Sequence, residues 1–219
     1  MPPRKFLTTL MLLAGFVTGA RAASEPELIQ AAAAGDTQRV VRLLRAGASL
    51  EARGNGQRSA LLAAVQANQV EAARALIAAG ANVNAKDAIG DSPYLLAGAR
   101  GRTEILHLTL GAGADLKSTN RFGGTALTPA CHYGHVETVR LLLTTKVEID
   151  QVNRLGWTCL LEAVILGDGG PAHVEIVTMV VAAGAQVNLA DAQGVTPLAH
   201  ARTRGQARVV AILLRAGPR

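Results

Sequence analysis

Short apolar segments with helical spacing come in pairs along this chain. Within residues 125–143, TALTPACHYGHVETVRLLL, the side chains of Leu127, Ala130 and Cys131 fall on one face of a helix. Gly134 interrupts the pattern, and a second apolar set follows in HVETVRLLL. Two helices this short cannot hide their apolar faces alone, so the pattern predicts helix pairs that stack on neighbouring pairs.

The pattern returns at a nearly constant interval marked by a Ser or Thr. The segments SALLAA, SPYLLA, TALTPA, TCLLEA and TPLAHA begin at residues 59, 92, 125, 158 and 196, at intervals of 33, 33, 33 and 38. Each hydroxyl is expected to accept a hydrogen bond from a free amide in the helix that it begins. A glycine two residues earlier, or Gln57 in the first copy, suits a tight turn with positive φ. A glycine suited to cap the second helix ends four of the five copies, and Lys146 replaces it in the copy that begins at residue 125.

A 33-residue period with a T-P-L-H-x-A-like core resembles the ankyrin repeat, and the resemblance covers nearly the whole chain after residue 22. It implies an all-α fold, an ankyrin-repeat solenoid of stacked helix-turn-helix units with hairpin-like turns. We expect a single domain in residues 23–219. Its six repeats are expected at 24–53, 54–86, 87–119, 120–152, 153–190 and 191–219, with the first and last as atypical caps.

The first residues have the pattern of a bacterial secretory signal peptide. Arg4 and Lys5 precede an apolar run from Phe6 to about Ala20, and Ala20-Arg21-Ala22 suits signal peptidase. The run is shorter than the roughly 18 to 20 residues that cross a bilayer, so we expect a cleaved signal in residues 1–22 rather than a membrane anchor. The mature chain is then expected in the periplasm or outside the cell, with no membrane insertion after cleavage.

Charge and composition narrow the expected partners. Loss of Arg4, Lys5 and Arg21 with the signal lowers the formal net charge from +6 to +3. The remaining surplus forms no Lys/Arg block, so nucleic acid is not an expected partner. Aromatic residues make up only 3% of the chain, so small side chains must build the core. We expect a monomer that binds an unidentified protein and holds no cofactor.

The closely spaced Cys131, His132, Tyr133 and His135 raise the question of a metal site or a thiol-imidazole catalytic pair. His135 begins the second helix of its repeat, which is a structural position. Cys131 lies on the first, or inner, helix of the repeat, on the side that faces the neighbouring copy. Cys159 falls five positions earlier in the frame of that copy, which places the two Cα atoms beyond the ~7 Å limit for a disulfide. We therefore expect two free, mostly buried thiols, and neither a metal site nor a catalytic pair.

The resemblance implies that targets contact the hairpin tips and the two positions before the glycine between the helices. In repeats four and five these positions gather arginine and most aromatic residues of the mature chain, and Trp, Tyr and Arg are common interface anchors. The alternative is that Leu155 and Trp157 fold back onto the next hairpin as packing. The expected partner-binding residues are Arg121, Phe122, His132, Tyr133, Arg154, Leu155, Trp157, Ile165, Leu166, Ile89 and Arg100.

Two local departures from the repeat are expected to alter its geometry. Residues 166–173, LGDGGPAH, contain five extra residues whose Gly-Gly-Pro composition predicts a protruding loop. The loop lacks the GK[ST] of a phosphate site and the oxygen ligands that calcium needs, so a tolerated insertion is favoured over a functional loop. Pro129, in the first turn of its helix, predicts a local distortion.

The leading functional hypothesis is a non-catalytic protein-protein interaction scaffold in the periplasm, which binds its partner on the concave face and hairpin tips. The chain has no nucleophile-elbow motif, no metal-spaced His/Cys/Asp cluster and no paired carboxylates in a common frame, which argues against an enzyme. The alternative is an inhibitor or immunity protein for one exported enzyme or toxin. An enzyme is the less favoured third class.

Overall fold

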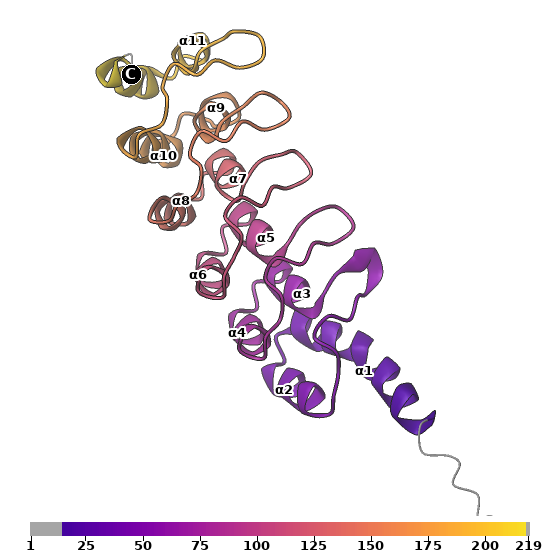
Figure 1. The fold of residues 1–219 in the computed structure, drawn as a ribbon. Coiled ribbons are helices and arrows are strands. Elements are labelled where there is room, and N and C mark those ends of the chain that lie inside the picture. Colours follow the sequence, from indigo (N-terminus) through magenta and orange to yellow (C-terminus); the bar gives the residue numbers. More distant parts are fainter. Residues whose placement is uncertain (1–14, 218–219) are drawn as a thin grey trace, which may run out of the picture.

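The computed structural model describes residues 15–217, and the side chains of residues 25–217, as helix pairs stacked in two rows (Figure 1). The inner row comprises α1 (Gly15–Ala34), α3 (Ala60–Gln66), α5 (Pro93–Ala99), α7 (Leu127–His132), α9 (Cys159–Ile165) and α11 (Pro197–Thr203). The outer row comprises α2 (Thr37–Arg45), α4 (Val70–Ala78), α6 (Thr103–Gly111), α8 (Val136–Leu143), α10 (Pro171–Ala182) and α12 (Ala207–Ala216). Each inner helix packs on its outer partner and on the next inner helix. The predicted all-α solenoid is confirmed.

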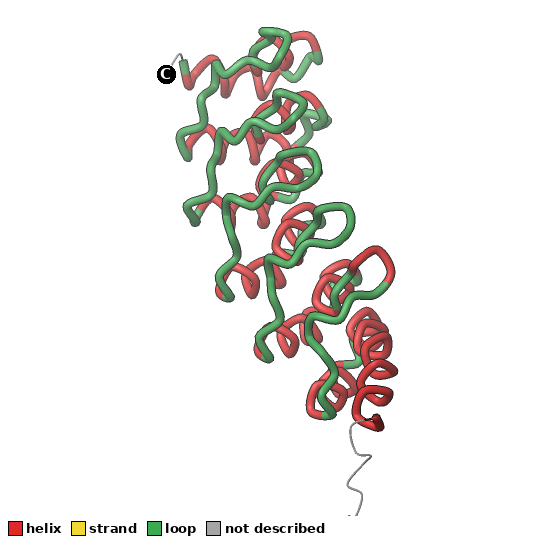
Figure 2. The backbone as a smooth tube through the Cα atoms, turned by 45° about the vertical axis from the view of Figure 1, so that its right-hand side comes forward, coloured by secondary structure: helices red, strands yellow, loops and turns green. Residues whose placement is uncertain are grey.

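Loops between successive helix pairs project to one side of the stack and form a row of hairpin tips (Figure 2). The first tip contains a short 3-10 turn, η1 (Asn55–Gln57), and the part of the chain that the structure describes contains no strand. At Gln57, where later copies have glycine, φ is 60°, so the positive φ expected of this position is present without glycine.

Four of the five recurrent Ser/Thr residues cap the inner helix that follows them. Their hydroxyl oxygens accept a hydrogen bond from the amide three residues later, as the sequence predicts; these residues are Ser59, Ser92, Thr158 and Thr196. The exception is Thr125, whose hydroxyl is buried without a partner, and α7 begins only at Leu127. The cause is Pro129, which stands where the other copies place the amide that donates to the Ser/Thr carbonyl.

An Asp or Asn five residues before four of the five Ser/Thr residues fixes the shape of the hairpin tip; before Ser59 this position is Gly54. The Oδ1 atom of Asp87 accepts hydrogen bonds from the amides of Ile89 and Asp91, both at 3.0 Å. Equivalent pairs of bonds are accepted by Asn120, Asn153 and Asp191. Backbone hydrogen bonds also join neighbouring tips, for example from the Arg154 amide to the Phe122 carbonyl at 2.8 Å. The tips are therefore held in one row along the stack.

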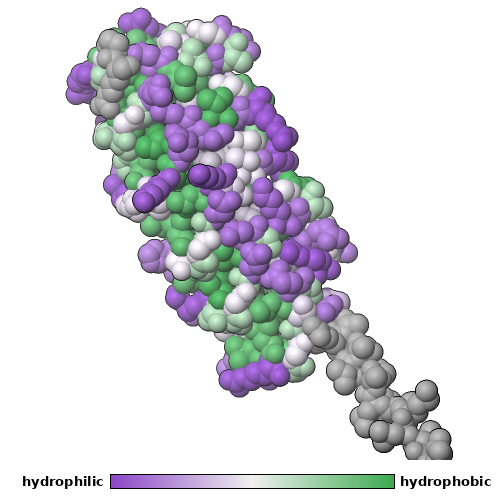
Figure 3. All heavy atoms as spheres, in the orientation of Figure 1, coloured by the Kyte–Doolittle hydropathy of each residue, from purple (hydrophilic) through white to green (hydrophobic). Residues whose placement is uncertain are grey.

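Small residues dominate the core, as the low aromatic content predicts. One inner-helix position is a buried alanine in five successive pairs: Ala64, Ala97, Ala130, Ala163 and Ala201. Alanine at this position lets neighbouring inner helices approach closely. The face shown in Figure 3 has hydrophobic surface along much of its length, with hydrophilic residues gathered toward the side of the projecting loops.

Cys131 and Cys159 form a disulfide between α7 and α9, so the prediction of two free thiols is wrong. Their Cα atoms lie 5.5 Å apart, and both side chains are buried. The prediction assumed that successive inner helices lie in register, but they are staggered. Gly98 and Ala126 occupy, one repeat earlier, the positions of the two cysteines. A Cβ added to Gly98 would lie 2.7 Å from the Cβ of Ala126. The stagger compensates for the five-residue difference between the positions of the two cysteines within their repeats. Small side chains at both positions let the backbones approach closely.

The end of α8 differs from the other outer helices because Lys146 replaces the glycine. In α4, Gly80 has a φ of 94°, and the next amide, of Ala81, donates to the Leu76 carbonyl at 3.0 Å. After α8, the corresponding amide of Val147 donates instead to the hydroxyl of Thr145 at 3.2 Å. The turn after α8 therefore differs in its hydrogen bonding, and a threonine side chain takes over part of the cap.

The expected signal peptide is only partly covered by the structure. Its residues 1–14 lie outside the described residues, and residues 15–22 form the start of α1. Within residues 15–217, no helix combines the length and the hydropathy needed to cross a membrane.

Candidate partner-binding groove

A groove of about 750 Å³ runs between the hairpin tips and the inner helices of four successive repeats. One wall carries tip residues, the other carries the carboxyl ends of α5, α7 and α9, and the floor contains residues such as Leu96, Pro129 and Glu162. Eight of the eleven predicted binding residues line it: Ile89, Arg100, Arg121, Phe122, His132, Tyr133, Leu155 and Leu166.

The groove collects most of the large apolar side chains that face solvent. In residues 25–217, seven such side chains are strongly exposed, and five of them line this groove: Ile89 (47% exposed), Phe122 (49%), Leu155 (50%), Tyr133 (60%) and Leu166 (40%). Ile89, Phe122 and Leu155 occupy the same tip position in three consecutive repeats, because the repeat length between them is constant. Clustered exposed apolar residues mark interaction surfaces more often than scattered ones do.

Charged side chains at the amino-terminal end of the groove pair across neighbouring tips. Arg58 lies 3.8 Å from Asp87, and Arg121 lies 3.8 Å from Asp91. Burial and the nearby charge of Asp87 raise the pKa of Asp91, and the Arg121 guanidinium partly offsets both effects. The guanidinium carbon of Arg121 also lies 4.6 Å from the ring centroid of Phe122. Cation-π contact and ion pairing thus hold this arginine over the apolar tip.

A stack of rings forms the inner-helix wall at α7. The rings of His132 and Tyr133 are stacked, with centroids 4.1 Å apart, and the rings of Tyr133 and His135 lie 5.9 Å apart. Burial lowers the pKa of His132, and the charge of His173 lowers it further. Burial also lowers the pKa of His135, which is the residue before α8 as predicted. Neutral imidazole rings give this wall a largely apolar character at neutral pH.

Three predicted residues do not line the groove. Trp157 is only partly exposed, and its indole nitrogen is buried without a hydrogen-bond partner. Ile165 is half-buried at the end of α9. Arg154 is exposed, but its guanidinium donates a hydrogen bond to the Arg121 carbonyl at 2.9 Å and so braces two tips. Of the two alternatives considered for Leu155 and Trp157, the leucine lies on the groove, whereas the tryptophan lies away from it.

A buried carboxyl group lies in the floor of the groove and was not among the predicted residues. Glu162 is only 7% exposed, and its Oε1 atom accepts a hydrogen bond from the Asn153 amide nitrogen at 2.8 Å. Burial raises the pKa of Glu162 to about 7, and the hydrogen bond from Asn153 limits the rise. The sequence did carry a signal, because the equivalent positions in the two preceding repeats are Leu96 and Pro129.

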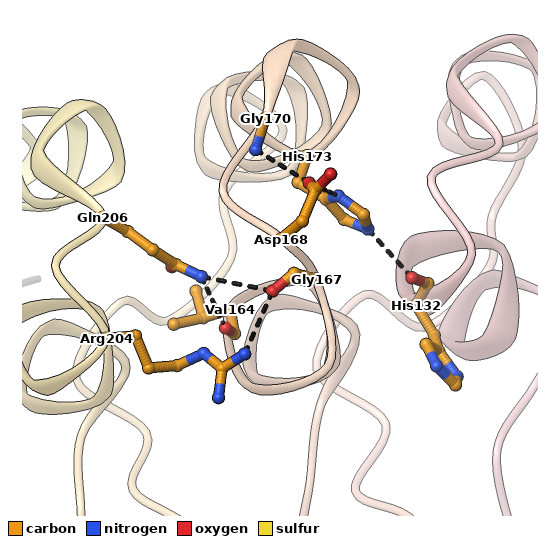
Figure 4. Close-up of polar contacts among 8 residues, drawn as sticks. All are labelled: His132, Val164, Gly167, Asp168, Gly170, His173, Arg204 and Gln206. Carbon is orange, nitrogen blue, oxygen red and sulfur yellow. Dashed lines mark hydrogen bonds and ion pairs between the residues drawn. The ribbon is translucent and has the colours of Figure 1, made fainter.

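The five-residue insertion is anchored to its neighbours on both sides (Figure 4). The His173 ring lies 2.8 Å from an oxygen of Asp168 and 2.9 Å from the His132 carbonyl oxygen. On the other side, the Gln206 amide donates to the Val164 carbonyl at 3.0 Å. Part of the insertion also lengthens α10, which has 12 residues against 8 in α8. The predicted protruding loop is thus a bonded turn, and His173 lies within α10 rather than directly before it.

The cluster of Cys131, His132 and His135 contains no free thiol. The sulfur of Cys131 is bonded to Cys159, so this pair supplies no thiol to His132 or His135. Within residues 15–217, no group of three or more His, Cys, Asp or Glu side chains is placed to hold a metal ion.

Comparison with known proteins places this geometry in a family. Residues 94–191 match the family described as ankyrin repeats (3 copies), and residues 57–88 match the single ankyrin repeat. A solved ankyrin repeat domain from Acinetobacter baumannii AYE is 53% identical, with a TM-score of 0.85, over 88% of this chain and 98% of that one. The chain belongs to the ankyrin repeat family. A second solved ankyrin repeat protein is 38% identical, with a TM-score of 0.83, over 86% of this chain and 96% of the other. No curated protein sequence gives a significant match.

As an ankyrin repeat protein, the chain has the framework of a protein-interaction scaffold, and the family is generally non-catalytic. The groove lies on the hairpin tips and inner helices, which carry the side chains that vary from repeat to repeat. The residues that recur, such as the capping Ser/Thr, form hydrogen bonds with the backbone and stabilise the helices.

Proposed function

We propose that this ankyrin repeat protein is a non-catalytic scaffold that acts in the periplasm and binds a protein partner in the groove on its concave face and hairpin tips. The observation that carries the proposal is the concentration of exposed apolar side chains in one groove, in which Phe122, Tyr133 and Leu155 are each about half exposed or more. A soluble chain exposes such side chains together at a cost in solubility that a bound partner removes.

Two features support a location outside the cytoplasm. One is the signal-like pattern of the first 22 residues. The other is the disulfide between Cys131 and Cys159, because disulfides persist in oxidising compartments and are rare in the cytosol. Fractionation of cells that produce the full chain tests this part of the proposal: a periplasmic chain shortened at its amino end is expected, and a full-length cytoplasmic chain would contradict it.

The binding site is tested by co-purification from periplasmic extract. The test variant changes Phe122, Tyr133 and Leu155 together to alanine, which removes apolar surface without touching the buried core. The matched control changes Val152 and Leu214 to alanine, since within residues 25–217 these are the two strongly exposed large apolar residues outside the groove. A partner that the native chain and the control retain and the test variant loses supports the proposal. Equal recovery with all three chains would contradict it.

A further inference from the structure

Glu162 holds an acidic group that is nearly enclosed yet incompletely bonded. One carboxyl oxygen accepts the hydrogen bond from Asn153. Within residues 25–217, the other carboxyl oxygen takes part in no hydrogen bond or ion pair. This oxygen is not fully buried. The side chain lines the groove, and the second oxygen is not fully enclosed, so a partner in the groove can reach it.

Within residues 25–217, no cationic side chain lies within ion-pair distance of this carboxyl group. The ionisable side chains on the helices packed against α9 are His132, His173, Glu175, His200 and Arg202, and Arg154 lies on the hairpin tip that precedes α9. Of these, His200 is paired with Asp191 at 2.7 Å and His173 with Asp168 at 2.8 Å, and the Arg154 guanidinium donates to a carbonyl of the neighbouring tip. None of the six lies within ion-pair distance of Glu162. A buried carboxylate without a counter-charge is costly, so the floor of the groove lacks one positive group.

The surroundings of Glu162 restrict what can supply this charge. Leu155, on the tip of the same repeat, and Leu166, one helical turn after Glu162, line the same groove, and both are exposed. Metal binding would need more acidic or imidazole ligands than this part of the described chain gathers. A long aliphatic stem that ends in one cationic group fits such a setting, because the stem contacts the leucines while the charge reaches the carboxylate.

We propose that Glu162 receives the ammonium or guanidinium group of a lysine or arginine in the docked segment of the partner, between apolar side chains of that segment that contact Leu155, Leu166 and Phe122. The inference rests on the proposed function, since it names the chemistry that the same groove recognises. A segment in the polyproline II conformation suits the row of tips, because its three residues per turn span about 9 Å and packed helices lie about 8–10 Å apart. One side chain in three can then meet successive tips.

Recognition of a cation links binding to pH. In the free chain burial raises the pKa of Glu162 to about 7, so the carboxyl group is mostly protonated in mildly acidic solution. The bound cation favours the carboxylate and lowers this pKa, so binding releases a proton when the solution is acidic. Affinity for a basic segment should therefore fall by about 30-fold between roughly pH 8 and pH 5.5.

The test uses a phage-displayed library of random peptides of about twelve residues, which span roughly 40 Å when extended. It is selected at about pH 8 against the native chain, Glu162→Gln, the exposed control Glu104→Gln, and the variant with Phe122, Tyr133 and Leu155 changed to alanine. Glutamine keeps an oxygen for Asn153, and circular dichroism verifies that each chain is folded. Peptides selected on the native chain are then measured by calorimetry beside versions in which norleucine replaces the basic residue.

The native chain and Glu104→Gln should select peptides with a lysine or arginine between apolar residues. Glu162→Gln should lose that preference and bind the native-selected peptide about 10- to 100-fold more weakly, without the pH dependence. Norleucine should weaken binding to the native chain and hardly change binding to Glu162→Gln. Groove-dependent peptides without a basic residue, or equal affinity for Glu162→Gln, would overturn the role of Glu162 and leave the proposed groove intact. If no selected peptide depends on the triple variant's residues, the proposed function is overturned as well.

Discussion

Removal of the disulfide between Cys131 and Cys159 should destabilise the middle of the stack. The informative variant changes both residues to alanine, because the equivalent pair Gly98 and Ala126 makes the same contact between α5 and the segment before α7 without a covalent bond. The variant therefore keeps the packing between repeats and loses only the link. Its effect measures what the link contributes.

The size of the effect follows from the sequence separation of the two cysteines, which is 28 residues. Closing a loop of that length in the unfolded chain corresponds to about 3.6 kcal/mol on the chain-entropy estimate. Alanine leaves little space at positions that small residues fill elsewhere, so a cavity should add only about 1 kcal/mol. A total loss of about 4–5 kcal/mol corresponds to a fall in Tm of about 8–20 °C for a chain of this size.

Urea unfolding followed by circular dichroism, with and without dithiothreitol, measures the difference. The reductant should lower the midpoint of the native chain and leave that of the double alanine variant unchanged. Titration of thiols in the unfolded, unreduced native chain should find none. Two reactive thiols in that titration, or a native midpoint that ignores the reductant, would refute the reasoning.

Three further substitutions probe the groove floor, the distorted helix and the insertion. Burial raises the pKa of Glu162 to about 7 from 4.5, so the folded chain holds a proton that the unfolded chain releases. The free energy of unfolding should therefore fall by up to about 3 kcal/mol from pH 4.5 to 8, relative to that of Glu162→Gln. Urea midpoints that change with pH in the same way for both chains would contradict this. Pro129→Ala restores an amide that can donate to the Thr125 carbonyl and should raise stability by about 1 kcal/mol, less the entropy that proline removes from the unfolded chain; a lower Tm would be the contrary result. Gln206→Ala removes buried hydrogen bonds to the turn between α9 and α10 and should lower the free energy of unfolding in urea by about 1–3 kcal/mol. The control Gln193→Ala, at an exposed position, should change it by less than about 0.5 kcal/mol. Equal effects of the two substitutions would count against the anchoring.

The fold was predictable because each recurrent residue has a local task that can be recognised without tertiary information. The hydroxyl of Ser92 caps the helix that follows it, and Asp87 bonds the amides of its own tip. Such contacts span two to four residues, so the sequence carries them directly. The period of 33 residues then implies stacking, because no single pair of short helices can bury its apolar face.

The disulfide was missed because it depends on the stagger between neighbouring helices, which no single repeat encodes. The period relates equivalent positions, but contacts between repeats join positions that are not equivalent. Gly98 followed by Ala126 was the available sign of this stagger, since two very small residues at these positions indicate close backbones. A correct stagger would have brought Cys131 and Cys159 within reach of each other.

The groove was predicted in part for a similar reason. The tip position of Phe122 and the helix-end position of Tyr133 project outward in every repeat, so their frame alone indicates exposure. Trp157 occupies a tip position as well, yet its indole nitrogen is buried, because the direction of one side chain depends on the neighbouring tip. Glu162 was not predicted because it lies at a buried position of the inner helix, whereas the predicted binding residues occupy positions that face outward.

The central claim is that the partner lies in the groove, and site-specific photocrosslinking tests it most directly. A photoreactive phenylalanine analogue replaces Phe122 in one chain and Leu214 in another, since both side chains are about half exposed but only Phe122 lines the groove. After irradiation of intact cells, the account predicts a crosslinked protein partner from position 122 and none from position 214. A partner crosslinked from position 214 and not from position 122 would contradict it.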